Sequence, residues 1–435
     1  METAVNGPVF RQAVDVEGLV TADSSPGLRV VRITSSSEHA HSHIYMEAPV
    51  FTPDGGRFIF QRVDPVPPDT NMQNRWREYW LCDLEDNFAL RQLTDEPGAI
   101  APCVTPDGRF MYYFITELDP RKRCGIRLKR VCLTSFTRET VMVLDRALSG
   151  LDAPPSRVYS LSTVRSDSAA VSTGVFIGDG ERNGTWGVLV CDVERGSADV
   201  VLAGPNYFNP HPQYSRSSDP KHCHDLLVQH NTGADTDPLG GLTNRRSGCT
   251  VEVIRDDGSD FREIPCGSAT ETCHGHQEWR GTSATTLIGV NHTFPDGTVT
   301  RPVIEAAPVP AVQADDTPPA LLPKAETSRN DITRELDGPA FGHTAIDSTG
   351  TRFVGDWRAV GEGAEATRLF VGTLPAVPDA ALSVRYVLHP RSSYTGDQVV
   401  HPHPFLSPDG TKAFFNSDFG GLPQIWMVDG VGDLF

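Results

Sequence analysis

The segment Phe51-Thr-Pro-Asp54-Gly55-Gly-Arg-Phe58-Ile-Phe60 decides the fold, because it recurs along the chain. The further copies are Val104-Thr-Pro-Asp107-Gly108-Arg-Phe110-Met-Tyr-Tyr113, Leu406-Ser-Pro-Asp409-Gly410-Thr-Lys-Ala-Phe414-Phe415 and a degenerate Ile346-Asp-Ser-Thr-Gly350-Thr-Arg-Phe353. Each copy predicts a β-hairpin, since Pro, Asp and Gly favour a tight turn and an alternating apolar strand follows. The first two copies begin at residues 51 and 104, a spacing typical of one β-propeller blade.

Length and composition extend this prediction to the whole chain. The 435 residues include 39 Gly and 34 Pro, and short runs of Val, Ile, Phe and Tyr are bounded by turn residues. At about 60 residues per blade the chain holds about seven blades. We therefore expect an all-β, seven-bladed β-propeller as a single domain over residues 1–435, with loop insertions near 231–249 and 302–329. Hairpins in a β-sandwich are the alternative. The strand at Trp426 is expected to close the fold by pairing near the N-terminus.

Charge and the N-terminal sequence limit the classes of partner. A formal net charge of −18 argues against nucleic acid or an anionic membrane as partner, although a small anion can still bind in a locally basic pocket. Residues 1–8 show no basic or apolar signal-peptide region, so we expect a cytoplasmic protein. The nine cysteines are expected to be reduced, because their number is odd and no C-x-x-C spacing occurs. The oligomeric state stays open.

The chain has 14 histidines, and 12 of them form groups near the ends of predicted strands. The clusters are His39/His41/His43, His211, His222/His224/His230, His274/His276, His343 and His401/His403. The innermost strands of a propeller converge, so histidines far apart in sequence can meet in a metal or acid–base centre. We expect His39, His41, His222 and His274 to be solvated or structural.

The segment Gln398-Val-Val-His401-Pro402-His403-Pro404-Phe405 is a candidate metal site. Residues i and i+2 of an extended segment share a face, about 7 Å apart, so both imidazoles can converge on one ion. Pro402 favours a strand start, because it lacks the N–H of a sheet ladder. An ordinary His/Pro-rich loop is the alternative, and imidazole ligands suit Zn, Mn, Fe and Ni alike.

These segments resemble the oligogalacturonate lyase family, seven-bladed propeller enzymes that act on short pectic fragments. The resemblance is strongest over residues 398–425, which end in Asn416-Ser-Asp-Phe-Gly-Gly-Leu-Pro-Gln-Ile425. It implies that Gln398, His401 and His403 bind a divalent metal, usually Mn²⁺, and that His343 adds a third histidine. It also implies that His276, in His276-Gln-Glu-Trp279, is the catalytic base.

Looser matches to the same family assign substrate contacts to His43, His211 and His230. The arginine that the family places before its catalytic histidine aligns with Thr250 here. The displaced Arg245 and Arg246 are therefore the candidates to orient a substrate carboxylate, which a guanidinium can bind through two parallel hydrogen bonds.

The resemblance implies metal-dependent β-elimination of oligogalacturonides, with a small anionic oligosaccharide as substrate. A base removes the C5 proton of a uronate, and a metal neutralises the adjacent carboxylate. A neutral imidazole suits the role of base, because it titrates near working pH. The alternatives are a lyase for a different uronate-containing glycan, a hydrolase or epimerase, and a TolB-like propeller that binds a partner without catalysis.

Overall fold

The computed structural model describes residues 3–4, 7–64, 76–117, 125–178, 180, 184–244, 248–267, 271–311, 329–337, 340–358, 363–377, 380–395 and 397–435. Arg245, Arg246 and residues 312–328 of the second predicted insertion lie outside these ranges. The chain divides into two compact units, which are described separately. The first comprises Met1–Phe10 and Ala48–Phe261, and the second Arg11–Glu47 and Arg262–Phe435.

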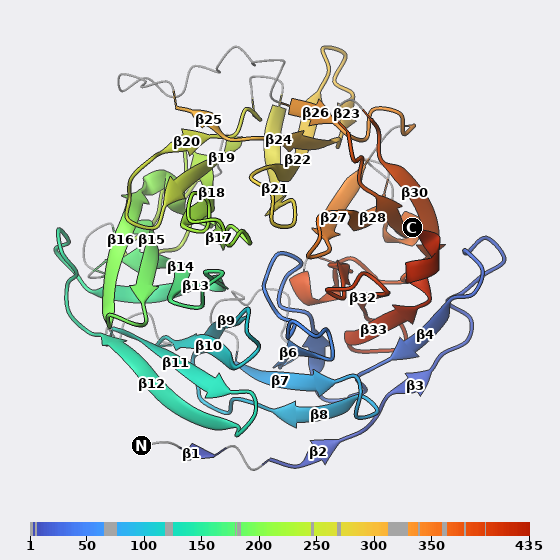
Figure 1. The fold of residues 1–435 in the computed structure, drawn as a ribbon, viewed down its shortest axis with the longest axis horizontal. Helices are drawn as coiled ribbons and strands as arrows, with labels where there is room; N and C mark the ends of the chain where they lie inside the picture. Colours follow the sequence, from blue (N-terminus) through green and yellow to red (C-terminus); the bar gives the residue numbers. More distant parts are fainter. Residues whose placement is uncertain are drawn as a thin grey trace. The chain divides into compact units, whose positions relative to one another are not determined.

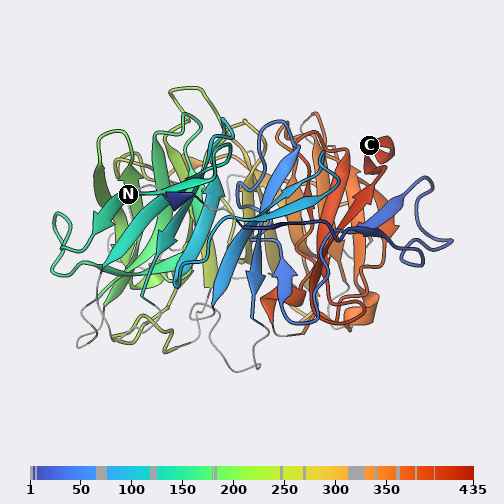
Figure 2. The ribbon, with the colours of Figure 1, turned by 90° about the horizontal axis from the view of Figure 1, so that it is seen from below.

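The strands form seven antiparallel sheets of four or five strands each, the blades of a seven-bladed β-propeller, as the sequence predicts (Figure 1). Figure 2 views the blades from the side, with neighbouring strands of a blade running in opposite directions. The other regular elements in the described ranges are short 3-10 helices. No helix in those ranges is both long and apolar enough to cross a membrane.

In the first unit, three sheets contain β2 and β6–β8, β1 and β9–β12, and β13–β16, and a further set contains β17–β19. Their bounds are β1 (Thr3–Ala4), β2 (Val9–Phe10), β6 (Arg57–Val63), β7 (Arg77–Asp83), β8 (Ala89–Gln92), β9 (Ala99–Val104), β10 (Phe110–Ile115), β11 (Ile126–Cys132), β12 (Thr137–Leu144), β13 (Pro155–Val164), β14 (Ala170–Ile177), β15 (Thr185–Asp192), β16 (Ser197–Gly204), η2 (Pro205–Tyr207), β17 (Gln213–Tyr214), β18 (Asp225–Thr232) and β19 (Gly248–Arg255).

In the second unit, three sheets contain β21–β24 and β26, β27–β30, and β3, β4 and β31–β33. Their bounds, with those of the remaining elements of this unit, are β3 (Val14–Asp15), β4 (Arg29–Arg32), β5 (Ala40–Ser42), β20 (Arg262–Glu263), β21 (Glu271–Trp279), β22 (Thr286–Thr293), β23 (Val299–Thr300), β24 (Val303–Ala306), β25 (Val309–Pro310), β26 (Arg329–Asp331), β27 (Phe341–Ile346), β28 (Arg352–Trp357), η4 (Ala364–Ala366), β29 (Arg368–Thr373), β30 (Ser383–Leu388), η5 (Gln398–Val400), β31 (Phe405–Leu406), β32 (Lys412–Ser417), β33 (Gln424–Asp429) and η6 (Val431–Leu434).

The repeated Pro-Asp-Gly segments form the turns that precede the second strand of a blade. In all four copies a glycine N–H donates to the carbonyl three residues earlier; the bonds are Gly55 to Thr52 (2.9 Å), Gly108 to Thr105 (2.8 Å), Gly350 to Asp347 (3.1 Å) and Gly410 to Ser407 (2.8 Å). These glycines have φ between 66° and 72°, a region that a Cβ disfavours. The hairpins expected from the repeats are therefore confirmed.

The C-terminal strand pairs with the N-terminal segment, as the sequence predicts. β33 is hydrogen-bonded to β4, with Trp426 opposite Arg32, so the blue β4 lies beside the red β33 in Figure 1. In the first predicted insertion, β18 ends at Thr232 and β19 begins at Gly248. The second insertion contains β24 and β25 within its described part.

Apolar side chains pack between neighbouring blades within each unit. One cluster in the second unit joins Leu287 and Val303 of one blade to Phe341 and Phe353 of the next, all almost fully buried. Burial of each such side chain contributes roughly 1.5–3 kcal/mol. All eight cysteines in the described ranges are free, and their reduced state stays a prediction.

Candidate metal and acid–base site

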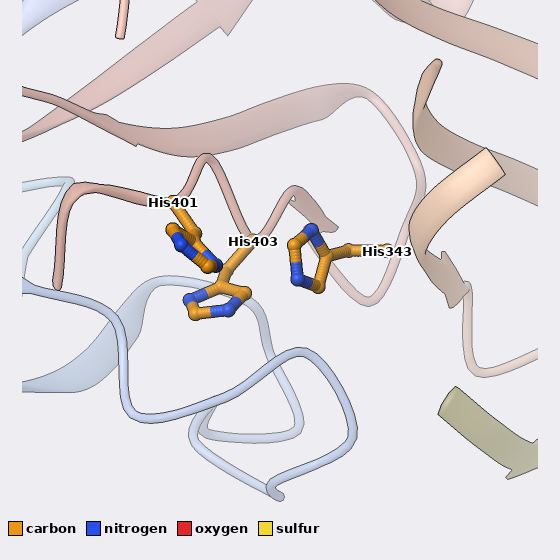
Figure 3. A group of neighbouring side chains, drawn as sticks. All are labelled: His343, His401 and His403. Carbon is orange, nitrogen blue, oxygen red and sulfur yellow. The ribbon is translucent and has the colours of Figure 1, made fainter. Parts of the chain in front are cut away.

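Three of the four predicted metal ligands lie together in the second unit. One potential ligand atom from each of His343, His401 and His403 lies within 4.8 Å of those of the other two. Figure 3 shows the three imidazoles grouped together, His343 on β27 and the other two on the segment before β31. His343 and His403 are each 3% exposed, and His401 is half-buried. A largely dry cluster of imidazoles is a suitable donor set for a divalent metal.

Asp356 of β28 holds His343 in one orientation. Its carboxylate accepts two hydrogen bonds from His343, one from the backbone N–H and one from Nδ1, each 2.7 Å long. Burial favours a higher pKa for Asp356, but the electrostatic interaction and the hydrogen bonds with His343 outweigh it and hold the pKa below its usual value. We assign the proton to Nδ1 from its carboxylate partner, which leaves Nε2 with the lone pair that a metal requires.

A β-bulge and a glycine bring these two residues together. The register between β27 and β28 shifts between Phe341 and Thr344, where His343 lies. A Cβ on Gly342 would lie 2.6 Å from Asp356 Oδ1 and 3.1 Å from the Tyr394 hydroxyl, so only glycine allows this approach. Bulges commonly redirect a side chain next to a functional site.

His401 and His403 each have a buried ring nitrogen with no hydrogen-bond partner among the residues that the structure describes. His401 donates from Nε2 to the Thr395 carbonyl (2.8 Å), while its Nδ1 has no partner. His403 Nε2 has none either. Burial lowers the pKa of His401 to about 4 and that of His403 well below 6.5, so both rings are neutral at pH 7. Metals bind neutral imidazole, and unpaired buried nitrogens are costly unless a ligand satisfies them. These residues therefore fit a divalent metal.

The backbone at His403 is strained. His403 lies between two prolines and has φ of +41°, which is uncommon for a residue with a Cβ. Such a conformation costs on the order of 1–3 kcal/mol and occurs mainly where the surroundings enforce it. The Asn416 side-chain amide donates to the His401 carbonyl (3.2 Å) and helps to hold this segment.

Gln398, the fourth predicted ligand, begins η5 and its side chain is exposed. Its backbone carbonyl accepts a hydrogen bond from the His401 N–H (3.1 Å), which ties the helix to the histidine segment. Metal ligation by its side chain stays a prediction.

His276, the predicted base, lies against the histidine cluster. Its ring centroid is 4.6 Å from that of His343. Its Nδ1 is 2.8 Å from Nδ1 of His274, a hydrogen bond in which one ring donates and the other accepts. Gly275 between them has φ of +99°, and the register of β21 shifts at this point, so a bulge orients both rings. His274 thus lies directly beside the candidate base.

A second glycine makes room for His274. A Cβ on Gly289 of β22 would lie 2.1 Å from His274 Nε2, so only a glycine accommodates this ring position. Burial lowers the pKa of His274 to about 3, with a smaller contribution from Arg301. A neutral His274 can accept the Nδ1 proton of His276, and this would leave Nε2 of His276 as the basic nitrogen.

Two tyrosines that we did not identify from the sequence complete the surroundings. The Tyr394 ring stacks on His401 with centroids 4.3 Å apart, and its hydroxyl is 3.2 Å from His343 Nδ1. The Tyr45 ring lies 4.9 Å from that of His403 and 6.1 Å from that of His276. Tyr394 belongs to no repeat or spacing pattern that would have marked it, whereas Tyr45 lies two residues after the predicted His43.

His43, predicted to contact substrate, is 1% exposed and stacks on Phe405 with centroids 3.5 Å apart. Its backbone N–H donates to Asn416 Oδ1 (2.8 Å), and burial lowers its pKa to about 3. In this structure it packs against Phe405, two residues after His403. A direct substrate contact stays a prediction.

The other two predicted substrate-binding histidines belong to the first unit. His211 is buried, with Nε2 2.8 Å from the Tyr159 hydroxyl. His230 is half-buried with its ring edge-on to Tyr207 (5.4 Å), and burial lowers its pKa. Arg245 and Arg246 lie outside the described residues. The roles of all four residues stay predictions.

Comparison with solved structures supports the fold. An oligogalacturonate lyase from Vibrio parahaemolyticus is similar over 97% of this chain and 98% of its own, with a TM-score of 0.66 and 19% identity. An oligogalacturonate lyase in complex with manganese is similar over 98% of each chain, with a TM-score of 0.65 and 19% identity. The acylaminoacyl peptidase of Pyrococcus horikoshii matches over 87% of this chain and 52% of its own, with a TM-score of 0.50 and 10% identity. No protein-family model and no curated protein matches the sequence. At these identities the similarity establishes the fold alone.

Proposed function

We propose that this chain is a metal-dependent lyase that cleaves short uronate oligosaccharides, in the first place oligogalacturonides, by β-elimination. The observation that carries the proposal is the contact between the predicted base and the histidine cluster, with the His276 and His343 rings 4.6 Å apart. The fold shared with an oligogalacturonate lyase in complex with manganese supports it.

His343, His401 and His403 would hold the metal, for which Mn²⁺ is the first candidate, and Gln398 would add an oxygen ligand. When bound, the metal would act as a Lewis acid that neutralises the uronate carboxylate beside C5. Asp356 would keep His343 in the tautomer that ligates through Nε2, as carboxylates commonly do for metal-bound histidines.

His276 would accept the C5 proton of the uronate. The electron pair of the C5–H bond then forms a double bond between C4 and C5 as the bond from C4 to its oxygen breaks. That oxygen leaves with the preceding sugar and takes up a proton from solvent. His274 would hold His276 through the Nδ1–Nδ1 hydrogen bond of 2.8 Å, with Nε2 of His276 directed to the substrate. A base fixed in one tautomer reacts without first having to reorient.

The test is product formation from digalacturonate and trigalacturonate, followed by ultraviolet absorbance. The purified protein is treated with a chelator, dialysed, and assayed with and without added Mn²⁺. We expect a metal-dependent unsaturated uronate product, which His276→Gln abolishes while Mn²⁺ binding persists. His403→Ala is expected to lose both product and Mn²⁺ binding.

Other results would separate the alternatives. Saturated product in place of unsaturated product would indicate a hydrolase and overturn the proposal. Absence of product with Mn²⁺ still bound would exclude galacturonate and direct the assay to oligosaccharides of other uronates. Absence of both product and Mn²⁺ binding would leave a propeller with a binding role.

A further inference from the structure

Two arginines of the second unit approach the His343 segment from neighbouring blades. Arg301 forms an isolated parallel β-bridge with Ala340, and the Arg358 N–H donates to the Ala340 carbonyl (3.3 Å). Ala340 lies directly before β27, which carries His343. The backbone therefore anchors both arginines at the entry to the strand that supplies a candidate metal ligand.

The side chain of each arginine extends toward residues that contact the site. The Arg358 guanidinium carbon lies 4.4 Å from the centroid of the Tyr394 ring, which itself stacks on His401. The Arg301 Nε donates to Asn291 Oδ1 (3.2 Å), and Asn291 is paired with Thr272 of β21, close to His274. Arg358 thus lies on the His401 side of the site and Arg301 on the His274 side.

Neither guanidinium has a carboxylate partner among the residues that the structure describes. Other half-buried arginines of this unit do: Arg280 pairs with Glu305 (2.5 Å) and Arg329 with Glu271 (2.9 Å). Both Arg301 and Arg358 are half-buried. In a chain with a net charge of −18, two partly buried cations that form no ion pair with a described carboxylate are well placed to receive an anion.

The electrostatics of the site agree with this geometry. Burial and then the charge of Asp356 raise the pKa of Tyr394, and Arg358 and Arg301 both act against that shift. After burial, the charge of Arg301 is the next largest cause of the lowered pKa of His274. Both positive charges therefore reach the residues around the candidate base and the metal cluster.

We propose that Arg301 and Arg358 form a carboxylate subsite that binds a uronate of the substrate beside the histidine cluster. This inference rests on the proposed function and deepens it, since it names the residues of this chain that would distinguish an acidic sugar from a neutral one. A guanidinium matches a carboxylate through two parallel N–H bonds, an arrangement that the ammonium of lysine cannot reproduce.

The test compares digalacturonate with the neutral disaccharide of the same linkage, digalactose, by calorimetry. The protein carries His276→Gln to stop turnover and is supplied with Mn²⁺. Arg301→Gln and Arg358→Gln are each expected to weaken digalacturonate binding about 10- to 100-fold, as loss of a charge-assisted bond implies. Binding of digalactose and of Mn²⁺ is expected to change less than about twofold, because neither requires the guanidinium groups.

Matched variants separate this role from a structural one. Arg385→Gln removes the same charge from an exposed position on β30, the outer strand of the blade that contains β27, and is expected to leave digalacturonate binding unchanged. Arg358→Lys retains the charge and is expected to show an intermediate loss. Thermal unfolding of each variant identifies any that has lost its fold.

The outcomes also distinguish this inference from the proposed function. Unchanged digalacturonate binding in both Arg→Gln variants, or an equal loss of digalactose binding, would overturn the subsite even if the wild-type protein is a lyase. Arginine-dependent digalacturonate binding by a wild-type protein that forms no unsaturated product would retain the subsite and reject the lyase. A folded, Mn²⁺-bound protein that binds no digalacturonate would overturn the subsite.

Discussion

Replacing Asp356 by Asn is expected to weaken divalent-metal binding about 10- to 100-fold with little change in the fold. Asp356 accepts both the backbone N–H and the Nδ1–H of His343 at 2.7 Å. An asparagine keeps one acceptor oxygen and turns an NH₂ group toward the other donor. The Nδ1–H of His343 would then point at this NH₂ group, which places two donors against each other. The alternative is that the proton moves to Nε2, the nitrogen that the metal requires.

The magnitude follows from the buried contact. Asp356 is 1% exposed, so a lost charge-assisted hydrogen bond there costs roughly 1.5–3 kcal/mol. Each 1.4 kcal/mol corresponds to about a tenfold change in affinity, which gives the stated range. The fold should persist, because the asparagine has the same shape and keeps the bond to the His343 backbone.

The assay is competition for Mn²⁺ against a chelating indicator at pH 7. Asp347→Asn is the matched control, since Asp347 is also buried and accepts the backbone N–H groups of Thr351 and Arg352 (both 2.9 Å) at a turn. It is expected to lower the stability without altering the intrinsic metal affinity. An Asp356→Asn protein that binds Mn²⁺ as tightly as the wild type would refute the assigned tautomer and the role of the carboxylate.

Three further changes have defined outcomes. Saturating Mn²⁺ should raise the thermal midpoint of the wild type by mass action and leave that of His403→Ala unchanged; an equal rise in both would place the metal elsewhere. The pKa of His43 is about 3 in the fold and 6.5 in the unfolded chain, so between these pH values His43 binds a proton only when the chain unfolds. The contribution of His43 to the free energy of unfolding is therefore complete above pH 6.5 and declines by about 1.4 kcal/mol per pH unit as the pH falls toward 3. Denaturant unfolding at pH 7, 5.5 and 4.5 should therefore show a shallower decline in His43→Phe than in the wild type, and parallel curves would contradict the shift. Gly289→Ala, whose Cβ would lie 2.1 Å from His274 Nε2, should lower kcat at least about tenfold while Mn²⁺ affinity is retained, and an unchanged kcat would exclude a positioning role for His274.

Much of the architecture could be predicted from the sequence, because it depends on local chemistry. The turn beginning at Thr52 requires a residue that accepts φ of about +70°, and Gly55 after Asp54 provides it within a few residues. The same pattern at Asp409-Gly410 predicted another hairpin. His401 and His403 could be identified in the same way, since they occur on one short segment with an unusual spacing.

The tertiary structure alone decided which residues surround those histidines. Asp356 on β28 accepts a hydrogen bond from His343 on the neighbouring strand β27. Tyr394 contacts both His343 and His401 from a loop. Neither the bulge at His343 nor the one at Gly275 follows from an alternating pattern, because a bulge adds a residue to one strand only and so reverses which face the following side chains occupy.

The hairpin repeat, the all-β fold class and the histidines of the 398–405 segment are therefore readable from the sequence, because each depends on neighbours in the chain. The folded structure adds the partners around them: the carboxylate of Asp356, the ring of Tyr394, and the positions of Arg301 and Arg358. The physical reason is that hydrogen bonds and charges act over a few ångströms in space, whereas the residues that make them come from different strands and blades, brought within reach only when the apolar faces between the blades have packed.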